Sequence, residues 1–156
     1  MAVVGAGPAG ASAALALGGR GLRVGIIEKA VPPRYKTCGG GVLRRALALL
    51  PVDVRAAVER ECFAAELVHH GPDLRFVCRR DRPIVSMVMR DRFDHLVTEA
   101  AVRAGAQLFA GTTVLDVMPG EDDVRLVTSA GEIRARFVVA ADGANSAGAL
   151  KTGRSG

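Results

Sequence analysis

The sequence predicts an α/β fold that opens with a strand–helix–strand unit and carries antiparallel β-strands inserted further along. Residues 2–4 are wholly apolar, as expected of a strand that is covered on both faces. Residues 8–18 are rich in alanine and leucine and end in glycine, which is typical of a helix. Short strand-like runs separated by glycine and proline fill much of the rest, so we expect a sheet with an inserted β-meander.

The first elements follow from composition and from their glycines. Ala2 to Val4 is shorter than the usual strand of ~5–6 residues, so the natural strand is expected to begin upstream. Pro8 to Gly18 is the expected helix, and further glycines close it. Leu22 to Glu28 is expected to be a second buried strand. Ala30 to Gly41 contains prolines and three consecutive glycines, so we expect a loop there.

The middle of the chain is expected to hold two helical segments and three strands. Val42 to Leu50 has a helical pattern that ends at Pro51, and Asp53 to Arg60 is expected to form another helix. The expected strands are Phe63 to His69, Leu74 to Arg79 and Ile84 to Met89, with turns at Gly71–Pro72 and Arg82–Pro83.

The last part of the chain is predicted to be one helix followed by strands. Arg92 to Ala104 carries apolar residues at the helical period, and Gly105 is the expected cap. No internal repeat is visible. The strands expected after it are Gln107–Ala110, Thr112–Met118, Val124–Thr128 and Ile133–Ala141, with turns at Pro119–Gly120 and Ala130–Gly131.

Composition excludes several classes of function. The net charge is +5, but arginine alternates with acidic residues over residues 79–82 and 90–92, which is typical of a solvated surface. One tyrosine and five phenylalanines provide little for base stacking, so we expect no nucleic-acid partner. The three cysteines form no CxxC pair, which argues against a metal site and a disulfide framework and favours a reducing compartment. No apolar run reaches the ~18 residues of a membrane span.

The turn after the first strand has the pattern of a phosphate-binding loop. Gly5-Ala6-Gly7-Pro8-Ala9-Gly10 fits GxGxxG, and it follows an apolar strand and opens a helix. In such a Rossmann-like unit Gly5 allows the tight turn, Gly7 lets the backbone approach a pyrophosphate, and Gly10 permits close packing of helix and strand. Pro8 suits the first helical turn, where its missing N–H costs nothing. We therefore expect a bound dinucleotide at this turn.

Glu28 is the candidate ribose ligand. It ends the second strand, eighteen positions after Gly10, which is close to the ~20 expected for the acid that binds a ribose hydroxyl. A carboxylate here also disfavours a 2′-phosphate, so NADP is not expected at this position. The structural alternative is a glycine-rich turn with a surface glutamate.

Three further segments carry candidate cofactor contacts. The glycines of Cys38-Gly39-Gly40-Gly41 would let a backbone lie against a flat ring system, although a flexible connection is the alternative. Arg90 precedes a helix and could reach the phosphate or ribityl region of a cofactor, although the segment taken alone favours a solvated surface arginine. Asp142-Gly143 follows a buried strand, where open α/β sheets bind ligands, although a simple turn would also fit.

Taken together, these segments resemble the FAD-dependent oxidoreductases of the geranylgeranyl reductase family. This family belongs to the flavoprotein fold group typified by p-hydroxybenzoate hydroxylase. The similarity covers residues 2–146, and the Cys-Gly-Gly-Gly loop is the part that favours this family over the hydroxylases. The matching segments are Gly5–Gly10, Glu28, Arg34 to Gly41, Arg90 to Asp94, and Ala141 to Ser146.

The resemblance implies a role for each candidate residue. The glycine-rich turn with Ala9 would hold the FAD pyrophosphate and Glu28 the adenosine ribose, and Lys29 and Arg34 would also contact the cofactor. Residues 38–41 would lie near the isoalloxazine, where Cys38 is the candidate reactive side chain. Val114 would contact adenine through its backbone. Arg90 would contact the ribityl or phosphate portion of FAD. Asp142 and Gly143 would face the cofactor.

The resemblance also implies a function. The expected activity is reduction of double bonds in a geranylgeranyl or other isoprenoid lipid by FAD, with NAD(P)H as the electron donor. Members of the family are longer, so the chain is expected to be truncated, with residues 1–146 an incomplete FAD/NAD(P)-binding domain and 147–156 a frayed tail. Two alternatives stay open, a flavin-dependent monooxygenase and a non-catalytic FAD-binding fragment. The expected location is cytoplasmic, with peripheral contact to a membrane, and the sequence leaves the oligomeric state open.

Overall fold

The computed structural model describes residues 1–71 and 74–144 and divides the chain into two compact units. The first unit comprises Met1–Arg34 together with the chain from Asp94 onward, and the second comprises Tyr35–Phe93. The predicted α/β class is confirmed, because a parallel sheet with helices and an antiparallel meander forms the first unit.

Four parallel strands form the centre of the first unit. They are β1 (Ala2–Val4), β2 (Gly25–Glu28), β8 (Gln107–Ala110) and β12 (Val138–Ala140), arranged in the order β12-β1-β2-β8. Register pairs Val4 with Ile27 on one side and with Ala140 on the other. The carboxyl ends of β1, β2 and β12 therefore lie at the same edge of the sheet.

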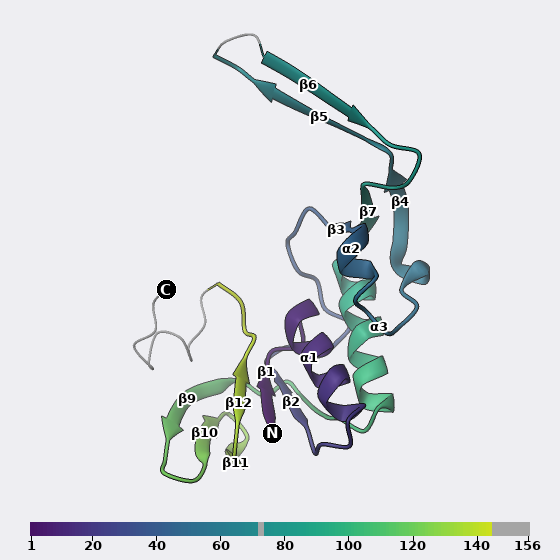
Figure 1. Cartoon of the computed structure of the whole chain (residues 1–156). Coiled ribbons are helices and arrows are strands. Elements are labelled where there is room, and N and C mark those ends of the chain that lie inside the picture. The colour runs from purple at the N-terminus through teal and green to yellow at the C-terminus, as the bar shows by residue number, and fades with distance from the viewer. Residues whose placement is uncertain (72–73, 145–156) are drawn as a thin grey trace. The chain divides into compact units, whose positions relative to one another are not determined.

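Helices cover one face of this sheet and a meander covers the other, as Figure 1 shows. The helices are α1 (Pro8–Gly18) and the part of α3 (Arg90–Arg103) that belongs to this unit. Val3 and Ile26 pack with Ala14 and Ala101 on the helical side. The antiparallel meander consists of β9 (Val114–Pro119), β10 (Val124–Thr128) and β11 (Gly131–Ala135).

Strand alternation places the remaining apolar side chains on the meander side. Ala2, Val4 and Ile27 pack around Leu126 of β10, which is fully buried. Since successive strand residues point to opposite faces, the wholly apolar run of β1 fills two cores at once. This explains why the first strand has no polar position.

The second unit is built from antiparallel strands and short helical turns. Its three-stranded sheet has the order β3-β7-β4, and β5 and β6 form a separate hairpin. The hairpin is exposed along almost its whole length. The elements are β3 (Gly41–Leu43), α2 (Arg44–Leu47), η1 (Arg55–Ala57), β4 (Val58–Cys62), β5 (Ala64–His69), β6 (Leu74–Arg79) and β7 (Val85–Val88).

Only short helical turns form in the two segments of the second unit that are predicted as helices. Val42 pairs with Ser86 in β3, so only Arg44–Leu47 is helical in the segment predicted as a helix over 42–50. In the segment 53–60 a short 3₁₀ turn gives way to β4, in which Val58 pairs with Val88. In both places pairing with β7, a strand distant in sequence, overrides the local helical pattern.

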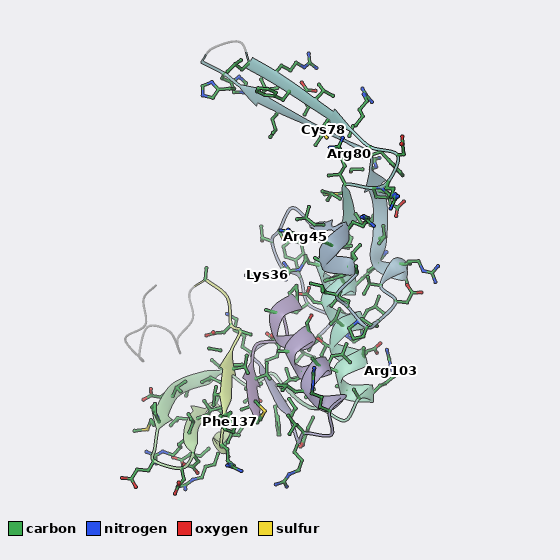
Figure 2. The ribbon with its side chains drawn as sticks, viewed as in Figure 1. Lys36, Arg45, Cys78, Arg80, Arg103 and Phe137 are labelled. Carbon is green, nitrogen blue, oxygen red and sulfur yellow. The ribbon has the colours of Figure 1, made fainter. Side chains whose placement is uncertain are left out.

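The largest differences in strand boundaries concern two predicted strands. The segment predicted as one strand over 133–141 is two strands, because β11 pairs with β10 in the meander whereas β12 pairs with β1 in the parallel sheet. Phe137, labelled in Figure 2, lies at the break between them. The second strand begins at Gly25 and not at Leu22, whose N–H donates to the Leu17 carbonyl oxygen at the end of α1. The predicted tail, 147–156, lies outside the described residues.

No helix within residues 1–71 and 74–144 is long and apolar enough to cross a membrane.

Candidate dinucleotide-binding site

The glycine-rich turn lies where three parallel strands end. The Gly5 N–H donates to the Ile27 carbonyl oxygen at 2.8 Å, and the Ala141 N–H donates to the Val4 carbonyl oxygen at 2.9 Å. These bonds continue the pairing of β1 with its two neighbours beyond the strands themselves. The turn, Glu28 and the Asp142 segment are thereby brought to one edge of the sheet, where open α/β folds bind ligands.

Helix α1 begins at this turn without a capping side chain. Gly7 occupies the position before the first helical residue, Pro8 begins the helix, and no acidic residue lies in the first turn. The first N–H groups of a helix have no partner within the helix and carry partial positive charge. An anion such as a pyrophosphate is the chemical complement of such an end.

The three glycines of the turn have different structural reasons. A Cβ built on Gly10 would lie 1.9 Å from the Gly5 carbonyl oxygen, and one built on Gly5 would lie 2.6 Å from the Ala141 carbonyl oxygen. The fold itself therefore requires both. A Cβ on Gly7 would meet only Arg34 Nη2, at an ordinary 3.8 Å. Packing therefore does not require glycine at position 7, and the absence of a side chain there fits the close approach of a ligand to the backbone.

Glu28 is buried and its carboxylate is held from two sides. Its Oε2 accepts a hydrogen bond from the Ala6 N–H at 2.7 Å, and its Oε1 accepts one from the Ala30 N–H at 3.1 Å. Only 5% of the residue is exposed. The sequence located this residue at the end of β2 beside the turn, and its carboxylate oxygens retain lone pairs for a ribose hydroxyl.

Arg34 connects Glu28 to helix α3. Its Nε lies 3.6 Å from Glu28 Oε1, and its Nη1 donates to Asp94 Oδ2 at 2.9 Å. Thr98, one turn further along α3, donates from its Oγ1 to the Asp94 carbonyl oxygen at 2.7 Å. Sequence reasoning assigned no role to Thr98. It also did not pair Asp94 with Arg34, because sixty positions separate these two residues in the sequence.

The remaining candidates of the first unit lie around the same edge. A Cβ on Gly5 would lie 3.1 Å from the Asp142 Cα, so the Asp-Gly segment adjoins the turn, and Gly143 follows it. The Thr112 N–H donates to the Glu28 carbonyl oxygen, which brings the chain leading to Val114 next to the end of β2. Lys29 is exposed beside Glu28. The predicted contacts of these residues with a cofactor stay predictions.

The candidates Cys38 to Gly41 and Arg90 belong to the second unit. Gly40 has φ +73°, and a Cβ there would lie 2.3 Å from the Val88 carbonyl oxygen, so the packing of the loop against β7 already requires this glycine. The Cys38 Sγ accepts a hydrogen bond from the Gly40 N–H at 3.4 Å. A Cβ on Gly39, in contrast, would meet nothing within 4 Å. The predicted contact of this loop with a flavin ring stays a prediction.

The fold and the turn define a dinucleotide-binding protein of the Rossmann-like type. The chain belongs to the FAD binding domain family, which matches residues 1–155. The family and the residues agree, because an uncapped helix end, a glycine at position 7 that packing does not require and a buried carboxylate at the end of β2 suit a pyrophosphate joined to a ribose.

Known relatives extend the similarity over nearly the whole chain. It is 35% identical over 153 residues to the geranylgeranyl diphosphate reductase of Rhodobacter capsulatus, covering 92% of this chain and 37% of the relative. It is 30% identical over 159 residues to the menaquinone reductase of Mycolicibacterium smegmatis, covering 94% of this chain and 38% of that protein. The chain therefore spans little more than a third of the length of these relatives.

A solved structure confirms the fold. The geranylgeranyl bacteriochlorophyll reductase-like protein from Thermoplasma acidophilum matches with a TM-score of 0.79 at 24% identity, covering 91% of this chain and 38% of that chain. The predicted resemblance to the geranylgeranyl reductase family, limited to its N-terminal part, is thereby confirmed.

Proposed function

We propose that this chain is the FAD-binding part of a reductase that acts on double bonds of a geranylgeranyl or other isoprenoid lipid. The observation that carries the cofactor assignment is Gly7, a glycine that packing does not require, at the uncapped start of α1 beside the buried Glu28. The substrate class is supported by the similarity to a geranylgeranyl diphosphate reductase.

Different residues of the chain would bind different parts of FAD. The backbone N–H groups of Gly7, Ala9 and Gly10 would donate hydrogen bonds to the pyrophosphate, and Glu28 would accept one from the adenosine ribose. Arg34 carries a positive charge next to Gly7 and would offset the charge of the phosphates. FAD, when bound, supplies the hydride-transfer chemistry.

For the flavin end of the cofactor, the proposed contacts are Cys38 to Gly41 and Arg90. Cys38 and Gly39 are both exposed, and the space at Gly39 is compatible with a flat ring lying against the backbone. Arg90 begins α3 and would contact the ribityl or phosphate portion. We also propose that NAD(P)H is the electron donor. The protein would contact a membrane peripherally.

The first test is the visible absorption spectrum of the purified, desalted protein, followed by release and chromatography of the chromophore. We expect a flavin spectrum and release of FAD and not of FMN, because the site offers a pyrophosphate cradle and a ribose acceptor. A protein that stays colourless after incubation with FAD would contradict binding by this chain and would favour a truncated fragment that binds FAD weakly or not at all.

The activity is tested on the loaded protein with NADPH and geranylgeranyl diphosphate under anaerobic conditions. Reduction of one double bond adds two hydrogen atoms to the lipid, which mass spectrometry detects directly. Free FAD with NADPH serves as the control. A parallel assay in air tests the alternative: oxygen consumption coupled to NAD(P)H oxidation, with no reduced lipid in either assay, would contradict the reductase and favour the monooxygenase.

A further inference from the structure

Three buried charged side chains from distant parts of the sequence form one cluster in the first unit. The charged cluster consists of Glu28 at the end of β2, Arg34 in the following loop and Asp94 in α3. Glu28 and Asp94 are 5% and 3% exposed, and the Arg34 side chain is 17% exposed. Two buried carboxylates thus share one guanidinium, and a buried charge is stable only when it is paired.

The charged cluster is continuous with the glycine-rich turn. Glu28 Oε2 accepts the Ala6 N–H, and Arg34 Nη2 is the heavy atom nearest to a Cβ built on Gly7. The guanidinium therefore uses Nη1 for Asp94 and directs Nη2 toward the turn. Because a guanidinium is planar and rigid, fixing one of its nitrogens fixes the direction of the others.

A second link joins α3 to the turn next to the charged cluster. The Thr98 Oγ1 bonds the Asp94 carbonyl oxygen at 2.7 Å and lies 3.4 Å from the Ala6 carbonyl oxygen. Only 2% of Thr98 is exposed. The stretch of α3 that carries Asp94 is consequently held against the turn by a buried hydroxyl as well as by the ion pair.

We propose that Asp94 is a positioning residue of the FAD site, acting through Arg34. By holding the guanidinium between Glu28 and Gly7, it orients the nitrogen that faces the phosphates and keeps the Glu28 carboxylate against the Ala6 and Ala30 amides. A side chain ordered before binding loses less conformational freedom on binding, which increases affinity. This inference rests on the proposed cofactor.

The principal variant is Asp94→Asn, which keeps the size of the side chain and removes its charge. We expect FAD binding, followed by flavin fluorescence, to weaken about tenfold, as when a charge-assisted hydrogen bond is lost. The matched control is Glu99→Gln, which removes an exposed acid of the same helix paired with Arg103, labelled in Figure 2. The control variant should bind as the wild-type chain does.

A double variant separates positioning from general weakening. Arg34→Lys keeps the positive charge but lacks the fork that reaches two partners. If Asp94 acts through Arg34, Asp94→Asn causes a much smaller loss of affinity in the Arg34→Lys background than in the wild type. The same tenfold loss in both backgrounds would overturn the proposal, as would unchanged affinity of Asp94→Asn.

Hydrogen exchange in the cofactor-free chain gives an independent readout. The Ala6 and Ala30 amides donate hydrogen bonds to the Glu28 carboxylate. Their hydrogens should exchange faster in Asp94→Asn than in Glu99→Gln, while the amides of β10 keep their exchange rates. If Asp94→Asn does not fold, Arg34→Lys is measured in the same way. Unchanged exchange at both amides overturns the inference.

A wild-type chain that binds no FAD overturns the proposed function instead, and the exchange rates still decide whether Asp94 positions the turn.

Discussion

Packing explains the glycines at positions 5 and 10 but not the glycine at position 7, which a bound ligand would explain. Gly10 and Gly5 approach backbone carbonyl oxygens so closely that no side chain fits at either position. Gly7 has φ −74° and ψ 179°, a conformation open to any residue, and its nearest neighbour is the tip of a flexible arginine. An alanine at position 7 would fit the fold, but its methyl group would keep a pyrophosphate away from the backbone.

Gly7→Ala should therefore separate folding from binding. We expect the free energy of unfolding to change by less than about 0.5 kcal/mol, while FAD affinity falls at least about tenfold because the backbone can no longer approach the phosphates. Urea denaturation and FAD titration measure the two quantities. Gly10→Ala is the comparison, since its Cβ would collide with the Gly5 carbonyl oxygen and should destabilise the fold by about 1–3 kcal/mol or more. Unimpaired FAD binding by Gly7→Ala would refute the role of this turn.

Individual elements differ in how far they are buried. Strand β10 lies in the middle of the meander, and its Leu126 is fully enclosed between the meander and the parallel sheet. The β5–β6 hairpin of the second unit exposes large apolar side chains on both strands, including Leu67, which is 71% exposed, and Phe76, which is 64% exposed. A two-stranded hairpin without a covered face contributes little stability of its own.

A matched pair of leucine substitutions tests this difference between elements. Leu126→Ala should lower the free energy of unfolding by about 2–5 kcal/mol, because it leaves a cavity between two sheets. Leu67→Ala removes the same atoms from a solvated position and should change it by less than about 0.5 kcal/mol. Urea denaturation of both variants provides the measurement. Equal losses would mean that the hairpin is covered in solution.

The 3₁₀ turn η1 begins at a local ion pair. Hydrogen bonds from the Arg55 guanidinium to the Asp53 carboxylate, aided by the Arg55 N–H, lower the pKa of Asp53 from 3.8 to about 2. Because the folded pKa is depressed, this pair contributes to stability above about pH 3.8, and the contribution disappears as the pH falls toward 2. Both side chains are largely exposed, so salt should weaken the effect.

Arg55→Gln should raise the pKa of the Asp53 carboxyl only part of the way back toward 3.8, because the backbone N–H of residue 55 still donates to it. The titration of the Asp53 side-chain carboxyl carbon by NMR measures this directly, with a midpoint near pH 2 in the wild-type chain and a higher midpoint in the variant. A midpoint that does not move would show that the guanidinium is not the cause.

At the scale of the whole chain, burial is distributed unequally between the two units. The first unit has two apolar clusters, one on each face of its parallel sheet, and it contains the glycine-rich turn and the charged cluster. The second unit contains the Cys38–Gly41 loop and the exposed hairpin. The similarity to relatives extends over both units but over little more than a third of the relatives' length.

Hydrogen exchange over the whole chain should reflect this distribution. Amides of β1 and β2, which are paired on both sides and buried on both faces, should exchange most slowly. Amides of β5 and β6 should exchange fastest among the strands, because each strand has one partner and is exposed on both faces. Mass-spectrometric exchange with peptide resolution provides the test. Equal protection of the hairpin and β1 would contradict it.

Local signals were enough to predict the start of the chain. The apolar run 2–4, the GxGxxG spacing and the alanine-rich helix gave β1, the turn and α1 with the boundaries that the structure has. Glu28 was located at the end of β2 by its distance from the turn. These features depend on neighbouring residues, whose geometry the chain itself fixes, so the sequence alone determined them and the FAD binding family to which they belong.

Only the tertiary structure decided features that depend on partners distant in sequence. Val42 joins a strand because β7 lies beside it, and the 133–141 segment divides because its two halves pair with different sheets. The pairing of Arg34 with Asp94 joins residues sixty positions apart. Periodicity and propensity describe what a segment favours by itself, whereas these arrangements follow from burial and hydrogen bonding between segments that meet only when the chain folds.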